Sequence, residues 1–309
     1  MQLPTVLEDA WDDFRRSRER KNRSAATLQV YRKSFEQFWT WALEAGVSPD
    51  PEAVDHSTIN QWSTYLLDAP AVRNGRVVGT ITPATRRIRF ANLRPFFGWY
   101  AREFETANPF DRADAPGDAQ PAPIPVVELD DVRALVKACS GRDFADRRDN
   151  AIIRVLFDTG ARLGELLALT SDDWDRRHDR LTLRGKTGTR IVPVSANTGE
   201  ALSRYLRVRR EHAHARRAEL WLGPKGALTA SGVAQVLKRR CALAGIEPIH
   251  PHQARHTFAH TFRATGGGEG DLMYLAGWKS TAMAHRYGRS AAAERAQAAA
   301  RKHAIGDHL

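Results

Sequence analysis

Residues 252–256 read His-Gln-Ala-Arg-His, and this short basic run decides how the rest of the chain is interpreted. His252 and Arg255 are three residues apart, so on a helix they face the same side. At a helix start, backbone N–H groups add affinity for an anion. The run therefore predicts a phosphate-binding pair, with His256 supporting the structure by hydrogen bonding.

The same region also allows a metal-site interpretation. His252, His256 and His260 recur every fourth residue and would share one helix face, as metal-binding histidines do. However, the run lacks a His-Glu-x-x-His pattern and a partner carboxylate, and Arg255 would repel a cation. We therefore expect no metal here.

Other residues with phosphate chemistry flank this run in a fixed order. They are Arg162, Lys186, Trp278 and Tyr287. Glu165 follows Arg162 by three residues and is expected to orient nearby groups. Two arginines, a lysine, a histidine, an indole N–H and a phenol suit one task, which is to hold a phosphodiester while the phenol attacks it. The set therefore predicts a site for phosphoryl transfer.

Each residue has an ordinary interpretation when it is taken alone. Arg162 and Glu165 form an i,i+3 pair that is common on helix surfaces. Lys186 lies in a glycine-containing turn, where most lysines are solvated. Trp278 and Tyr287 are residue types that usually pack in a core. Only the joint pattern indicates chemistry.

Charge and composition narrow the class of partner. The 309 residues include 47 Lys and Arg against 36 Asp and Glu, a net charge of +11, and arginine suits bidentate phosphate contacts. The whole excess lies from residue 126 onward, with 31 basic and 20 acidic residues. A nucleic acid is the expected partner, ahead of an anionic membrane.

The expected compartment is the cytoplasm. Cys139 and Cys241 are the two cysteines, and they lack metal-ligand spacing, which favours a reducing environment. The N-terminus is acidic, unlike a signal peptide, and no apolar run reaches the length of a membrane span.

Residues 1–110 are expected to form a helical domain. Apolar residues at helical spacing predict helices over residues 3–21, 24–46 and 55–67 and from residue 82 onward, with Pro95 as a potential kink. Residues 73–79 predict a turn or small hairpin. Residues 111–125 hold four prolines and few large apolar side chains, so they predict a linker.

Residues 126–309 are expected to form a second domain, mainly α-helical with a small β-sheet. Two strands are predicted over residues 180–184 and 190–194, around a turn containing two glycines. Helices are predicted at 129–139, 150–159, 164–169, 198–217, 229–244, 251–264, 269–276, 281–286 and 291–302.

The ordered set resembles the tyrosine recombinase (phage integrase) family, and in particular its simple Xer-like site-specific recombinases. The family's arginine, lysine, histidine, arginine, histidine-or-tryptophan and tyrosine match Arg162, Lys186, His252, Arg255, Trp278 and Tyr287. There are two departures. Trp278 stands where many members have histidine, and Gln253-Ala254 replaces a commoner apolar residue.

The resemblance implies a fold and a set of partners. The fold is an N-terminal helical DNA-clamp (SAM-like core-binding) domain over residues 1–110, a linker, and a C-terminal α+β catalytic domain over 126–309. A homo-tetramer would act on double-stranded DNA with inverted-repeat sites, exchanging the helix at 291–302 between neighbours. A plain intramolecular cap is the alternative for that helix. Arg86, Arg87 and Arg89, at the start of the fourth predicted helix, are expected to contact DNA, and a merely solvated basic helix end is the alternative.

The resemblance also implies a mechanism without a cofactor, a nucleotide or a metal. Tyr287 would attack the scissile phosphate to give a 3′-phosphotyrosyl link, and Lys186 would protonate the leaving 5′-oxygen. Two alternatives remain at this point. A type IB topoisomerase-like enzyme would religate the same strand, and a catalytically silent protein would only bind DNA.

Overall fold

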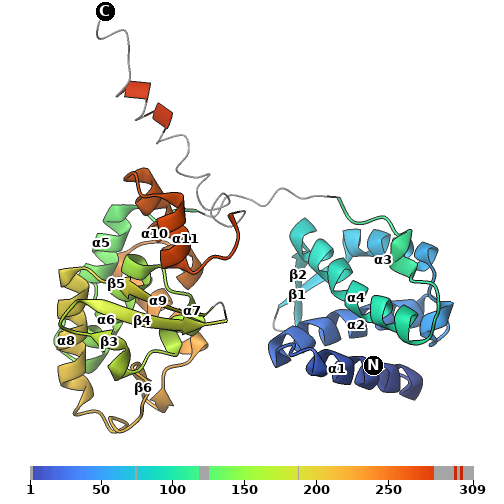
Figure 1. The fold of residues 1–309 in the computed structure, drawn as a ribbon, viewed down its shortest axis with the longest axis horizontal. Coiled ribbons are helices and arrows are strands. Elements are labelled where there is room, and N and C mark those ends of the chain that lie inside the picture. Colours follow the sequence, from blue (N-terminus) through green and yellow to red (C-terminus); the bar gives the residue numbers. More distant parts are fainter. Residues whose placement is uncertain are drawn as a thin grey trace, which may run out of the picture. The chain divides into compact units, whose positions relative to one another are not determined.

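The computed structural model describes residues 3–73, 75–117, 125–186, 188–281, 296–297 and 300–301. The chain divides into two compact units, Met1–Ala122 and Pro123–Leu309. Each unit has its own hydrophobic core. Figure 1 shows helices in both units and small sheets. No helix of the described residues is long and apolar enough to cross a membrane.

Where the structure describes it, the first unit is a bundle of four helices with one hairpin. Its elements are α1 (Thr5–Arg20), α2 (Ala25–Glu44), the 3₁₀ turn Pro51–Ala53, α3 (His56–Asp68), β1 (Pro70–Arg73), β2 (Arg76–Thr80), α4 (Pro83–Glu103) and the 3₁₀ turn Pro109–Asp111. Side chains cap three helix starts, because Ser24, Asp55 and Thr82 each accept a hydrogen bond from the backbone N–H three residues later. These local signals explain why the predicted helices match, and α4 continues past Pro95.

Aromatic side chains fill the core of this unit. Phe14, Phe35 and Phe38 are buried, and the rings of Phe38 and Trp62 meet edge to face with centroids 5.6 Å apart. Edge-to-face contacts add to the free energy gained by burying large rings. The α3–α4 connection forms the β1–β2 hairpin, as the predicted turn or hairpin at 73–79 anticipated.

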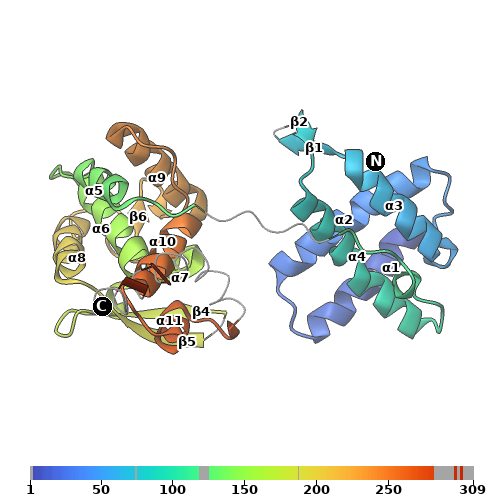
Figure 2. The same ribbon diagram turned by 90° about the horizontal axis from the view of Figure 1, so that it is seen from above.

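The second unit is helical, with a three-stranded antiparallel sheet in the order β3-β4-β5. Its helices are α5 (Leu129–Lys137), α6 (Phe144–Thr159), α7 (Leu163–Leu167), α8 (Ala196–Arg209), α9 (Ala230–Ala244), α10 (Pro251–Ala264) and α11 (Glu269–Ala276). Its strands are β3 (Trp174–Asp175), β4 (Arg180–Gly185), β5 (Gly188–Pro193), β6 (Leu222–Gly223) and β7 (Gly226–Ala227), and a 3₁₀ turn spans Ser171–Asp173. Figure 2 shows α11 beside the β4–β5 hairpin.

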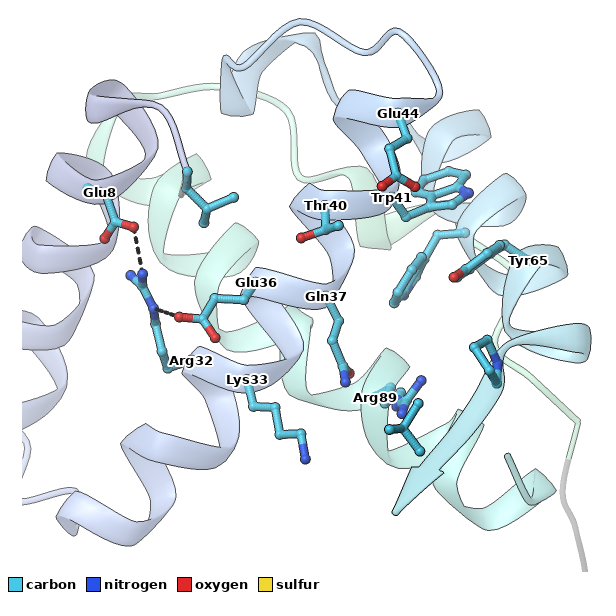
Figure 3. Close-up of a pocket in the computed structure, with 14 residues that line it drawn as sticks. Glu8, Arg32, Lys33, Glu36, Gln37, Thr40, Trp41, Glu44, Tyr65 and Arg89 are labelled. Atoms are coloured by element: carbon cyan, nitrogen blue, oxygen red, sulfur yellow. Dashed lines mark hydrogen bonds and ion pairs between the residues drawn. The ribbon is translucent and has the colours of Figure 1, made fainter. Parts of the chain in front are cut away.

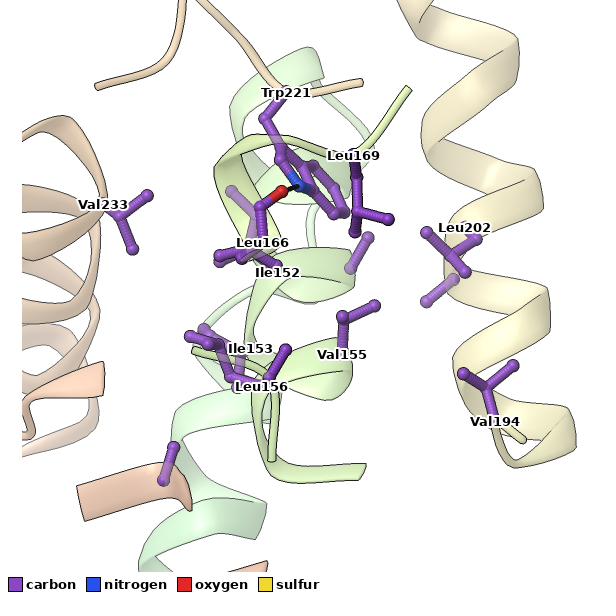
Figure 4. Packing of buried hydrophobic residues seen from close by; sticks show 14 of the residues in the cluster. Ile152, Ile153, Val155, Leu156, Leu166, Leu169, Val194, Leu202, Trp221 and Val233 are labelled. Atoms are coloured by element: carbon purple, nitrogen blue, oxygen red, sulfur yellow. Dashed lines mark hydrogen bonds between the residues drawn. The ribbon is translucent and has the colours of Figure 1, made fainter. Parts of the chain in front are cut away.

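Helix α6 is central in the core of the second unit. It packs against α8 and α10, and Ile152, Ile153 and Leu156 are fully buried. Figure 4 shows these side chains below Trp221, whose indole N–H donates to the carbonyl oxygen of Leu166 at 2.9 Å. This bond ties α7 to the core of the second unit.

Two helices begin or end at residues other than those predicted. The helix predicted at 150–159 begins earlier, at Phe144, because the Asp143 side chain caps it by accepting from the N–H of Asp146. The helix predicted at 198–217 ends at Arg209. The guanidinium of Arg209 donates to carbonyl oxygens of the following loop, those of Ala215, Arg217, Glu219 and Leu220. These bonds stabilise a folded loop where a longer helix was predicted.

Candidate active site

Four of the predicted site residues line one pocket of about 350 Å³ in the second unit. The pocket lies between the start of α7, the start of α10 and the turn after α11. Its lining residues are Ala161, Arg162, Leu163, His250, Pro251, His252, Arg255 and Trp278. Three segments far apart in the sequence therefore meet at one place, as the phosphoryl-transfer interpretation requires.

Arg162 lies at the entrance to α7 and is held from two sides. Its Nη1 donates to Oε1 of Glu165 at 2.8 Å, and its Nη2 donates to the carbonyl oxygen of Gly277 at 3.0 Å. The side chain is about one-third exposed, so it borders both solvent and the core. The guanidinium is therefore oriented by fixed acceptors while it borders the pocket.

Glu165 is a buried carboxylate shared by two arginines. Its Oε2 accepts from the backbone N–H of Arg162 at 2.8 Å, and both of its oxygens accept from Arg190, also at 2.8 Å. Burial raises the pKa of Glu165, but the hydrogen bonds from Arg190 and Arg162 outweigh it and lower the pKa to about 2. The carboxylate is therefore ionised at neutral pH, and its hydrogen bonds orient Arg162.

Arg190 is the residue that the sequence analysis missed. It lies on β5, only 6% exposed, on the same face as the buried Val192 and Val194, whereas Ile191 between them is 50% exposed. Successive residues of a strand point to opposite faces. This alternation was the available signal, since an arginine stands at an inward position of the predicted strand.

Arg255 is a buried residue of the pocket lining, and its guanidinium caps the C-terminal ends of two helices. Its Nη1 donates to the carbonyl oxygen of Gly160 at 2.7 Å, and its Nη2 donates to that of Ala276 at 2.6 Å. Its Cζ lies 5.2 Å from the ring centroid of Trp278, a cation–π contact. Arg255 thus fixes the ends of α6 and α11 and supports Trp278, which is itself buried.

His252 lies in the first turn of α10, exposed at the pocket, as predicted for a residue at a helix start. His256 is buried one turn later, and the two rings are perpendicular with centroids 5.0 Å apart. Gln253 has a local role, since its Oε1 accepts from the backbone N–H of His250. Among the described residues, no group of three or more His, Cys, Asp or Glu side chains is placed to hold a metal ion.

Lys186 lies at the turn between β4 and β5, and its side chain is exposed. It is not among the described residues that line the pocket. Its neighbour Gly185 packs against the site, because a Cβ on Gly185 would lie 2.8 Å from Oε1 of Glu165. The β4–β5 turn that carries Lys186 therefore begins next to the buried carboxylate of Glu165. Tyr287 and most of the predicted helices at 281–286 and 291–302 lie outside the described residues.

Arg86, Arg87 and Arg89 lie in the first two turns of α4, in the first unit. Arg87 is exposed, whereas Arg86 and Arg89 are half-buried. Figure 3 shows Arg89 in a groove of about 740 Å³, near Gln37 of α2 and across from Tyr65 of α3. Burial lowers the pKa of Arg89 from its ordinary value.

Comparison with known proteins assigns the family. The model of the phage integrase family matches residues 125–294, more than half of the chain. Tyrosine recombinase XerC of Thermodesulfovibrio yellowstonii is 28% identical over 77% of this chain and 77% of its own. Tyrosine recombinase XerD of Corynebacterium glutamicum is 29% identical over 80% of this chain and 81% of its own.

Solved structures share the fold. The Tn1549 transposon integrase, solved with transposon right end DNA, has a TM-score of 0.72 at 19% identity and covers 96% of this chain and 98% of its own. The XerH recombinase, solved with its palindromic difH substrate, has a TM-score of 0.68 at 15% identity, covering 91% and 81%. The predicted fold class is thus confirmed. The chain belongs to the phage integrase family and is a tyrosine-type site-specific DNA recombinase.

Proposed function

We propose that Tyr287 is the nucleophile and that the pocket around Arg162 and Arg255 binds the scissile phosphate. The phenolic oxygen forms a bond to phosphorus while the bond from phosphorus to the 5′-oxygen breaks. The products are a 3′-phosphotyrosyl link and a free 5′-hydroxyl. The covalent link conserves the energy of the broken bond, so a 5′-hydroxyl from a partner strand reverses the step and exchanges strands without ATP.

The observation that carries this proposal is that Arg162, His252, Arg255 and Trp278 line a single pocket. Phosphoryl transfer concentrates negative charge on the oxygens that do not bridge to sugar, and donors fixed in advance stabilise that charge. Arg162 is fixed by Glu165 and Gly277, and Arg255 by Gly160 and Ala276. Side-chain cations thus supply the charge stabilisation, which supports a mechanism without a metal.

Two residues move protons in this scheme. His252, exposed at the pocket in the first turn of α10, accepts the proton of Tyr287. Lys186 protonates the leaving 5′-oxygen. Lys186 lies at a hairpin tip, and the adjacent Gly185 packs on Glu165. This position supports the role because an ammonium on a long stem can reach a phosphate that Arg162 holds.

The first unit, which includes residues 1–110, would clamp the other side of the duplex. Residues 69–102 hold seven arginines and no acidic residue, among them Arg86, Arg87 and Arg89 at the start of α4. Such a local excess favours phosphate contacts. Four copies would assemble in the cytoplasm on two inverted-repeat sites by exchanging the helix at 291–302, with residues 111–125 as the linker between the two domains.

Covalent capture tests this proposal. Duplexes of random sequence with a nick are incubated with the protein in EDTA, and those that remain bound on a denaturing gel are sequenced to give the recognition site. We expect adducts with the wild-type chain and none with Tyr287→Phe, which lacks only the phenolic oxygen and should keep its affinity for the duplex. Adducts that persist in Tyr287→Phe would exclude this residue as the nucleophile.

A further inference from the structure

Arg190 is connected to the pocket through a closed ring of hydrogen bonds. Both of its Nη atoms donate to Glu165, and its Nε donates to the carbonyl oxygen of Leu275 at 2.7 Å, in the last turn of α11. Glu165 accepts in turn from Arg162, and Arg162 donates to Gly277, two residues after Leu275. The ring joins β5, α7 and the turn that carries Trp278.

The turn at Gly277 shows how closely the two arginines approach this segment. Gly277 has a φ of +63°, and a Cβ placed there would lie 2.9 Å from Nη1 of Arg190 and 3.4 Å from Nη1 of Arg162. Both guanidiniums therefore pack against the same backbone. A movement of Arg190 would release Leu275 and Glu165 together, and through them Arg162.

Arg190 also changes the charge available at the pocket. A buried carboxylate paired with Arg162 alone would cancel the positive charge that Arg162 presents to a phosphate. Arg190 supplies a second positive charge, so the three ionised groups, Arg162, Glu165 and Arg190, keep a net charge of +1. Because Glu165 and Arg190 are buried, the effect of their charges on Arg162 is screened less than it would be between surface residues.

We propose that Arg190 is a positioning residue for DNA cleavage, which aligns Arg162 on the scissile phosphate and keeps its positive charge available by neutralising Glu165. This inference rests on the proposed function of the pocket. It assigns to Arg190 an effect on one particular phosphate oxygen, the one that Arg162 contacts. A purely structural ion pair would have no such preference.

Methylphosphonate substrates measure that preference. A methyl group replaces one of the two non-bridging oxygens, which removes the negative charge of the phosphate and makes the cation at that oxygen dispensable. The rate of covalent adduct formation is measured in single turnovers on the captured site with an ordinary phosphate and with each of the two methylphosphonate diastereomers.

On the ordinary phosphate we expect Arg162→Ala to slow cleavage by about 10²-fold or more, as for other fixed donors, and Arg190→Gln to slow it by at least about 10-fold. One diastereomer should bring both variants to within about 3-fold of wild type, and it should be the same diastereomer for both. The double variant should be no slower than Arg162→Ala, since both act through one contact.

Arg240 provides the matched control, since it is a buried arginine on α9 that pairs with Asp149 and Asp146 away from the pocket. Arg240→Gln should lower the thermal midpoint but show no preference between diastereomers. If Arg190→Gln does not fold, Arg190→Lys, which keeps one positive charge, is measured in the same assay in its place.

Equal slowing of all three substrates by the Arg190 variant would overturn the positioning role. Rescue by the opposite diastereomer to that of Arg162→Ala would overturn it too. Failure of the proposed function looks different, because the wild-type chain would then form no adduct on the ordinary phosphate.

Discussion

Arg162 donates a hydrogen bond of 3.0 Å to the carbonyl oxygen of Gly277, a residue 115 positions further along the chain. The bond makes the conformation of one turn part of the phosphate-binding pocket. Gly277 ends α11 in the left-handed region, and Trp278 follows it directly into the pocket lining. The geometry of Arg162 therefore depends on a backbone position that has no side chain.

Gly277→Ala tests this dependence. The new Cβ would lie 2.9 Å from Nη1 of Arg190, so we expect the guanidiniums to shift and strand cleavage to slow by about 10-fold or more. Gly245→Ala is the control, because Gly245 has a φ of +68° at the end of α9 but nothing within 4 Å of its Cβ position. Both variants should lose about 1 kcal/mol of stability from the strained φ. Equal cleavage rates in the two would contradict the coupling.

The ionisation of Glu165 makes the folding stability depend on pH in the acidic range. Its pKa falls from 4.5 to about 2 on folding, so its stabilisation is present above pH 4.5 and is lost as the pH falls toward 2. A shift of this size corresponds to about 3 kcal/mol at neutral pH. Urea unfolding of the wild-type chain and Glu165→Gln should therefore show a difference in stability at pH 7 that becomes smaller as the pH is lowered to 3.

The matched control for that titration is Glu200→Gln. Glu200 forms an exposed i,i+4 pair with Arg204 on α8, and such pairs contribute little. Its stability should stay close to that of the wild-type chain across the same pH range. A gap between Glu165→Gln and wild type that is the same at pH 3 and pH 7 would show that ionisation of Glu165 is not responsible.

Lys186→Ala should slow cleavage severely with little change in affinity, because one phosphate contact among many contributes little to binding. A substrate with sulfur in place of the bridging 5′-oxygen has a leaving group that needs little protonation. It should restore cleavage in Lys186→Ala but not in Arg162→Ala, whose defect is lost charge stabilisation. If the sulfur substrate fails to rescue Lys186→Ala, the lysine is not the general acid.

The arginines at the start of α4 should contribute to DNA binding. Arg87→Ala should weaken binding to the captured site and lower the slope of log affinity against log salt by about 1, the value for one lost phosphate contact. Arg16→Ala is the control, since Arg16 is exposed on α1 beside Asp13. Fluorescence anisotropy at a series of salt concentrations measures the DNA affinity of the two variants. Identical slopes in the two variants would remove Arg87 from the DNA interface.

Local interactions explain which parts of the fold the sequence predicted. The helix starts at Ser24, Asp55 and Thr82 are fixed by side chains that accept a hydrogen bond from the backbone N–H three residues later. Such a start can therefore be predicted from a few neighbouring residues. The end of α8 was wrong because it depends on Arg209 and the carbonyl oxygens of a loop up to 11 residues away. A helical pattern contains no information about such a bond.

By itself the sequence determined the helical character of both units, the order of Arg162, Lys186, His252, Arg255, Trp278 and Tyr287, and through that order the family. Only the tertiary structure decided that Glu165 is buried between two arginines and that Arg190, 25 residues away, is the second of them. The physical reason is that a charged side chain can be buried only with a partner. That partner is chosen by packing of β4 on α7 and of β5 on α11, which no local pattern specifies.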